Sequence, residues 1–224
     1  MEISWYGNGC FRLRSQIGTV ITDPYPTSPT LRLPKLSAAV VSVSDPTLCD
    51  EAAVKREDHS LLVTGPGEYE IGGIFIQGVP MQSRGQPQTS TQSPVTAFVF
   101  EMEGLAVCHL GLPWEAPSAA QIENLGDIDV LLLPVGGPER IGVQAVADLA
   151  SGLEPKVLIP MYYSLPDVPD DRFHTLDRLA HELGTKLPEP DATFNTRRKG
   201  GIGQNTLVLL ECRAQLRRET VAKV

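Results

Sequence analysis

Two carboxylates and a thiol lie within six residues of one another, at Asp45, Cys49 and Asp50. Side chains of these types bind divalent metals or take part in nucleophilic chemistry. Histidine, the commonest metal ligand in proteins, is absent from this stretch. The segment therefore has part of the composition of a metal site and lacks the imidazoles that usually complete one.

Each of these residues also has an ordinary structural role. Asp45 precedes Pro46, an arrangement that is typical of the start of a turn. Asp50 can cap a helix that begins at Glu51 by accepting a hydrogen bond from a free backbone N–H. Cys49 is small enough to fill a gap beside the main chain.

The four residues before this segment, 40–43, read Val-Val-Ser-Val and predict a strand that is buried on both faces. Pro46 has no N–H to donate and ends the ladder. Residues 45–50 therefore lie at the carboxyl end of a central strand, which is where α/β proteins usually place their chemistry.

The remaining pattern is rich in strands in the first half of the chain and alternates helix and strand in the second. Strands are predicted at residues 3–6, 10–14, 18–22, 61–64, 71–79, 96–102, 105–110, 130–135, 157–160 and 207–210. Helices are predicted at residues 52–58, 118–125, 142–153 and 170–183. Residues 27–35 predict a proline-rich loop and residues 81–94 a mobile one. Two mixed sheets with helices outside, in a layered α/β sandwich, satisfy this pattern.

Composition excludes several classes of protein. The chain has 224 residues and a net charge of −8, which argues against binding along a nucleic-acid backbone. No apolar run approaches the ~20 residues needed to span a bilayer. The four cysteines include no C-x-x-C pair, so we expect a reducing, cytoplasmic setting. We expect one domain over residues 1–212 and a polar tail over residues 213–224.

Six short phrases occur in a familiar order. They are Trp-Tyr-Gly-Asn-Gly-Cys-Phe-Arg at 5–12, Thr-Asp-Pro-Tyr at 22–25, Gly-Pro-Gly-Glu-Tyr-Glu-Ile-Gly-Gly at 65–73, Val-Cys-His-Leu-Gly at 107–111, Leu-Pro-Val-Gly-Gly at 133–137 and Ile-Pro-Met-Tyr-Tyr at 159–163. Together they resemble the metallo-β-lactamase-fold hydrolases, and within them the short branch similar to the ascorbate-6-phosphate lactonases. The resemblance implies a four-layer αββα sandwich and a Zn or Mn centre.

The same resemblance implies where the metal ligands should lie. The family's ligand positions fall on Asn8, Asp45, Thr47, Cys49, Asp50, Ser83, Leu112 and Tyr162. A leucine cannot bridge metals, threonine and serine are poor ligands for zinc, and tyrosine binds only as a phenolate, with a reference pKa of about 10. The chain thus resembles a divergent member that lacks the family's metal ligands, and we expect no metal cofactor.

The resemblance, taken together with these substitutions, implies a binding, structural or regulatory protein that has lost metal binding and hydrolysis. We expect Leu112 and Tyr162 to fill part of the space that metals would take. The old groove would be lined by Asn8, Asp45, Glu68, His109, Tyr162 and Tyr163. We expect a homo-oligomer or a pairing with an active relative, and neither a nucleic acid nor a membrane as partner; the ligand is open.

Two alternatives are enzymes. One is a metal-dependent hydrolase of the same branch with an altered metal shell. The other uses Cys49 as nucleophile and His109 as base, with Asp45 or Asp50 as orienting group. His109 is otherwise expected to be a buried, hydrogen-bonded residue.

Overall fold

A computed structural model describes residues 1–27, 30–81, 95–197 and 206–216. The strands of the first half are β1 (Glu2–Trp5), β2 (Phe11–Arg14), β3 (Thr19–Thr22), β4 (Leu31–Arg32), β5 (Ser37–Ser42), β6 (Lys55–Val63), β7 (Gly67–Ile71), β8 (Ile74–Pro80), β9 (Thr96–Met102) and β10 (Leu105–His109). The later elements are α1 (Ala119–Leu125), β11 (Val130–Pro134), α2 (Val143–Leu153), β12 (Val157–Met161), α3 (Leu176–Glu182), β13 (Phe194–Asn195), β14 (Thr206–Leu207) and β15 (Gln215–Leu216).

The first sheet has six strands in the order β13-β1-β2-β3-β5-β6. Strands β1, β2 and β3 form the antiparallel meander that the tight turns after residues 6 and 14 favour. Strand β5 then pairs parallel to β3, and β6 pairs parallel to β5. The sheet is therefore mixed, and the carboxyl ends of β3 and β5 lie side by side.

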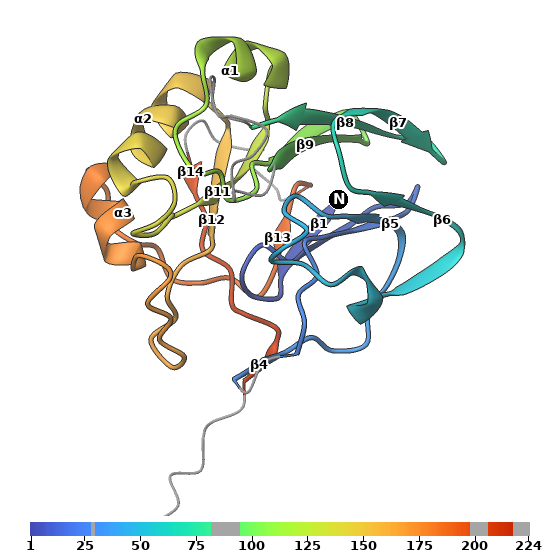
Figure 1. Cartoon of the computed structure of the whole chain (residues 1–224), viewed down its shortest axis with the longest axis horizontal. Helices are drawn as coiled ribbons and strands as arrows, with labels where there is room; N and C mark the ends of the chain where they lie inside the picture. Colours follow the sequence, from blue (N-terminus) through green and yellow to red (C-terminus); the bar gives the residue numbers. More distant parts are fainter. Residues whose placement is uncertain (28–29, 82–94, 198–205, 217–224) are drawn as a thin grey trace, which may run out of the picture.

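The second sheet has seven strands in the order β14-β12-β11-β10-β9-β8-β7. Strands β7 to β10 are antiparallel, and β10, β11, β12 and β14 are parallel. Helices α1 and α2 cross over between parallel strands, and α3 follows the last of the central ones. All three helices gather on one side of the molecule, beside β11, β12 and β14 (Figure 1).

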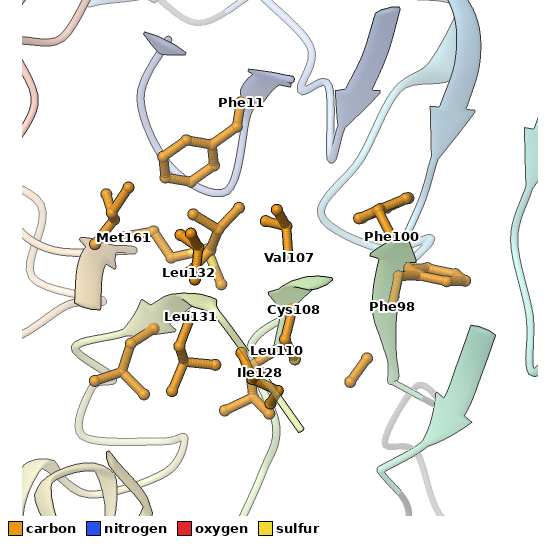
Figure 2. Close-up of a cluster of buried hydrophobic side chains, with 14 of the residues drawn as sticks. Phe11, Phe98, Phe100, Val107, Cys108, Leu110, Ile128, Leu131, Leu132 and Met161 are labelled. Carbon is orange, nitrogen blue, oxygen red and sulfur yellow. The ribbon is translucent and has the colours of Figure 1, made fainter. Parts of the chain in front are cut away.

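The main core lies between the two sheets. Figure 2 shows Phe11 of β2 facing Val107 and Leu132 of the second sheet, and all three side chains are fully buried. The neighbouring Leu131 points to the opposite side of its sheet, so β11 is buried on both faces. This two-sided burial is the physical reason for the continuous apolar run at 130–135.

A smaller apolar cluster covers the other face of the first sheet. Val20 and Val40 face the main core, whereas the adjacent Ile21 and Val41 face the second cluster. Tyr6, Cys10, Tyr25, Leu36, Ala38 and Val54 complete that cluster. In the described residues this outer layer is made by the segment after β3 and a short 3-10 turn at Glu51–Ala53, not by an α-helix. The two mixed sheets of the predicted sandwich are confirmed, with helices over one of them.

Two predicted helices are wrong in extent. The helix expected at 52–58 is a single 3-10 turn, because Lys55 and the residues after it pair with β5 as β6. The helix expected at 170–183 begins only at Leu176. Asp170 instead accepts hydrogen bonds from the backbone and side chain of Arg172, and His174 N donates to Gly136 O at 2.8 Å. Long-range pairing thus overrides a local helical pattern in both places.

Two strand predictions and one loop prediction also differ in detail from the structure. The break expected at Gly72-Gly73 in the segment 71–79 is confirmed, but it is a hairpin turn between the end of β7 and the antiparallel β8. The last strand of the second sheet is Thr206–Leu207, earlier than 207–210. The proline-rich loop contains β4, which pairs with β15 in the segment predicted to be a tail. Apart from Met81, the loop predicted to be mobile lies outside the described residues.

No helix in the described ranges is long and apolar enough to cross a membrane.

Candidate functional site

The chemistry-bearing residues converge where the parallel strands of both sheets end. Asp23 follows β3, and Asp45 follows β5. Across the core, His109 ends β10, Arg140 lies in the loop after β11, and Tyr162 follows β12. Parallel strands place their carboxyl ends at one edge, so residues distant in sequence meet there.

The loop after β5 is held by its own side chains. Asp45 Oδ1 accepts hydrogen bonds from Thr47 N at 2.9 Å and Thr47 Oγ1 at 2.6 Å. Asp50 Oδ1 accepts from Ala52 N at 3.1 Å and caps the 3-10 turn. The turn-starting role of Asp45 and the capping role of Asp50 are therefore as the sequence indicates.

A buried hydrogen-bond network surrounds Asp23, whose exposure is 1 %. Its carboxylate accepts from Ser44 N at 2.6 Å, from Ser44 Oγ, and from Tyr162 Oη at 2.8 Å. Burial, followed by the charge of Asp23, raises the pKa of Cys49, and the same causes raise the pKa of Tyr162. Tyr162 therefore acts as a neutral hydrogen-bond donor that locks β12 to the first sheet.

Tyr162 adopts a left-handed backbone conformation, with φ 50°, which is unusual for a bulky residue. The strain is held by three contacts: its hydroxyl on Asp23, its ring against Phe173 with 5.7 Å between centroids, and its N–H on Asn8 O at 3.3 Å. The ring fills the space over Gly9, where an added Cβ would lie 2.5 Å from Tyr162 Oη. Tyr162 and Leu112 are 3 % and 2 % exposed, and that they fill the space of a metal centre stays a prediction.

Gly9→Ala is expected to lower the free energy of unfolding by about 2–4 kcal/mol, because the new methyl overlaps a ring that cannot move. Urea denaturation measures the change. Gly65→Ala is the matched control, since nothing lies within 4 Å of its Cβ position. In a Tyr162→Ala background the same Gly9 substitution should cost much less, and equal costs in the two backgrounds would contradict this packing.

His109 is fully buried and has a structural role. Gly111 N donates to Nδ1 at 3.2 Å, so the proton lies on Nε2, which donates to Gly9 O at 2.9 Å. Nε2 is 3.7 Å from Asp23 Oδ2. Both ring nitrogens are hydrogen-bonded to main-chain groups. His109 therefore has no free nitrogen to act as the base in the alternative reaction, in which Cys49 is the nucleophile.

Arg140 brings a nearly buried positive charge to the site. Its Nη2 lies 3.1 Å from Asp45 Oδ2, and its Nη1 donates to Leu112 O at 2.9 Å. The guanidinium lies 3.6 Å from the centre of the Trp114 ring, and the side chain is 12 % exposed. One arginine thus links two of the positions to which the resemblance assigns metal ligands.

Two adjoining cavities open in front of this network. One, of about 340 Å³, is lined by Leu48, Leu112, Trp114, Pro138, Glu139, Arg140, Asp171, Arg172 and Phe173. The other, of about 280 Å³, includes Asn8, Tyr25, Thr47 and Tyr163 in its lining. Leu48, Arg172 and Phe173 belong to both. The site is therefore a groove with an apolar half beside Arg140 and a more polar half beside Asn8.

The structure distributes the predicted site residues unevenly. Asn8, Thr47 and Tyr163 line the polar cavity, and Leu112 lines the apolar one. Asp45, His109 and Tyr162 are buried behind these walls. Glu68 lies exposed on β7 and lines neither cavity, and Ser83 lies outside the described residues.

Within the buried polar network, sequence reasoning missed Asp23 and Arg140. Asp23 stood in one of the quoted phrases, Thr-Asp-Pro-Tyr, so its place in a shared motif was an available signal. Arg140 stands in a polar Pro-Glu-Arg loop that resembles ordinary solvated surface, and no sequence signal marked it.

The side chains that meet here do not fit a zinc or manganese centre. Both oxygens of Asp45 are engaged, one by Thr47 and one by a guanidinium that would repel a cation. Leu112 supplies only a carbonyl, already bound by Arg140, and Tyr162 donates its hydroxyl proton to Asp23. Within the described ranges, no three His, Cys, Asp or Glu side chains gather so as to hold a metal.

Comparisons with known proteins agree with the architecture. Residues 2–162 match a family model described as the beta-lactamase superfamily domain. A candidate Zn-dependent hydrolase of the metallo-β-lactamase superfamily from Thermotoga maritima is 30 % identical, covers 94 % of this chain and 99 % of its own, and superposes with a TM-score of 0.74. A UPF0173 protein from Pyrococcus furiosus is 26 % identical over 73 % of this chain and 83 % of its own. A UPF0173 metal-dependent hydrolase from Pyrococcus horikoshii is 29 % identical over 57 % of this chain and 56 % of its own.

Proposed function

We propose, from the premise that this chain belongs to the beta-lactamase superfamily and is related to UPF0173 metal-dependent hydrolases, that it has exchanged metal-dependent hydrolysis for binding. The ligand would enter the groove that faces Arg140, Trp114 and Asn8. Descent from the lactonase-like branch is part of the same proposal.

The ion pair between Arg140 and Asp45 carries this proposal. In the family's chemistry a metal lowers the pKa of bound water and polarises a substrate oxygen. Here the guanidinium of Arg140 binds one oxygen of the buried carboxylate of Asp45, and Leu112 stands where the resemblance places a bridging carboxylate. The remaining donors cannot surround an ion without displacing Arg140.

Neither excess zinc or manganese nor excess chelator is expected to shift the melting midpoint by more than about 1 °C. A tight site would instead stabilise the fold by about 2.7 kcal/mol at 100 times Kd, or roughly 5–10 °C for a domain of this size. Differential scanning fluorimetry of untagged protein measures the shift.

The alternative, a metal-dependent hydrolase with an altered shell, is favoured by the names of the relatives. It requires a metal-induced rise of several degrees that disappears in a Cys49→Ser, Asp50→Asn double variant. That result, together with metal-dependent hydrolysis of a lactone or phosphodiester substrate, would replace the binding proposal with the hydrolase.

A further inference from the structure

The guanidinium of Arg140 has binding capacity beyond its contacts within the protein. An arginine side chain carries five N–H donors. Two of them bind Asp45 and Leu112, and the ring of Trp114 covers one face. The same side chain lines the cavity of about 340 Å³, so its remaining donors can meet a bound molecule there.

Most of the remaining lining of that cavity is apolar. Its apolar walls are Leu48, Leu112, Trp114, Pro138 and Phe173, and three charged residues, Glu139, Asp171 and Arg172, also line it. Leu112 is 2 % and Phe173 8 % exposed, so these two walls belong to the core, while Leu48 and Trp114 are half-buried and Pro138 is exposed. A pocket with mainly apolar walls and one nearly buried, oriented cation, Arg140, is suited to a ligand with an apolar body and one acidic group.

The other charges of the cavity limit the ligand further. Asp170 binds Arg172 through two oxygens, at 2.6 and 2.9 Å, and the Arg172 side chain is 65 % exposed, so solvent screens its charge, whereas the Arg140 side chain is 12 % exposed. Glu139 and Asp171 are exposed at the rim, where solvent and salt screen them. They disfavour a multiply charged phosphate more than a single carboxylate, because repulsion grows with ligand charge.

We propose that Arg140 is a carboxylate receptor and that this cavity binds a monocarboxylate with an aromatic or branched apolar body. The guanidinium then takes the place of a metal as the fixed cation of the site, because it contacts both a protein carboxylate and a ligand oxygen. It activates no water, because a guanidinium has no open coordination position. The inference rests on the proposed binding function and specifies its ligand class.

The test uses three probes of similar size with the same phenyl body: phenylacetate, its isosteric amide phenylacetamide, and the cation 2-phenylethylammonium, with chelator present throughout. Binding is followed by isothermal calorimetry and by the fluorescence of Trp114, with Trp114→Phe identifying the source of the signal. Phenylacetate should bind saturably in the millimolar range, at least about tenfold more tightly than the amide or the amine.

Variants separate ligand contact from support of the fold. Arg140→Lys keeps a charge for Asp45 but loses the planar fork, and should weaken phenylacetate at least about fivefold while changing the amide less than about twofold. Leu48→Phe fills the cavity and should weaken both. Arg14→Met removes an exposed arginine on β2 and should change neither.

Equal or tighter binding of the amide or the amine would overturn the carboxylate assignment, as would an Arg140→Lys protein that folds and keeps full carboxylate preference. Absence of saturable binding up to about 20 mM would overturn it as well, since that is weak even for a fragment of this size. None of these outcomes depends on how metal or chelator shifts the melting midpoint. Failure of the proposed ligand class is therefore distinguishable from failure of the binding proposal.

Discussion

Asp23→Ala is expected to lower the free energy of unfolding by about 3–5 kcal/mol, a large part of the 5–15 kcal/mol typical of a domain. The carboxylate is 1 % exposed and accepts from Ser44 N, Ser44 Oγ and Tyr162 Oη. Alanine leaves these buried donors without a partner, and each unpaired donor costs about 1–3 kcal/mol. Asp23 also has φ 37°, which aspartate tolerates better than alanine.

Urea denaturation measures this loss of unfolding free energy, and two further variants serve as references for its size. Tyr162→Phe removes one donor and leaves the acceptor with others, so it should cost only about 1 kcal/mol. Asp127→Asn changes an exposed carboxylate and should stay within about 0.5 kcal/mol of the parent. An Asp23→Ala protein within about 1 kcal/mol of the parent would show that Asp23 does not join the sheets.

Arg140→Met is expected to cost about 3–5 kcal/mol, because it leaves Asp45 charged, fully buried and without its cation. Asp45→Asn alone should cost less, since the guanidinium keeps its contacts with Leu112 O and Trp114. The double variant Asp45→Asn, Arg140→Met should cost well below the sum of the two, because no buried charge then remains unpaired.

Chemical denaturation of the four proteins gives a double-mutant cycle. A coupling free energy of about 2 kcal/mol or more is expected, within the range for residues in direct contact. Additive losses would mean that Arg140 and Asp45 stabilise the fold independently. Arg14→Met reports the cost of losing an exposed arginine and should be close to zero.

The sequence was sufficient for features that depend on neighbouring residues. The two apolar segments at 96–102 and 105–110, with a turn at Glu103-Gly104 between them, predicted the hairpin of β9 and β10, and the helix predicted at 118–125 begins after Ser118, which forms a capping box with Gln121. The turn at Asp45 and the cap at Asp50 were predicted correctly for the same reason, since each side chain bonds a backbone N–H two residues away. Six local phrases in order also sufficed for the fold.

The same local reasoning failed where pairing partners are distant. Residues 55–58 have a helical pattern, yet they extend along β5 because a strand there completes the first sheet. Residues 170–175 do not form a helix, because His174 N donates a hydrogen bond to the distant Gly136 O. A periodic pattern describes what a segment can bury, and tertiary contacts decide which option is taken.

By itself, the sequence determined that this chain has the two-sheet scaffold of its family and that imidazoles are missing from the central loop. Only the tertiary structure decided what stands there instead. Asp23 meets Tyr162 from 139 residues away, and Arg140 meets Asp45 from 95 residues away. The physical reason is that the charge of an arginine in a polar loop looks the same in sequence whether it is solvated or buried. Its role is decided by the fold, in which the carboxyl ends of the parallel strands of both sheets bring a carboxylate, a carbonyl and an indole ring around it.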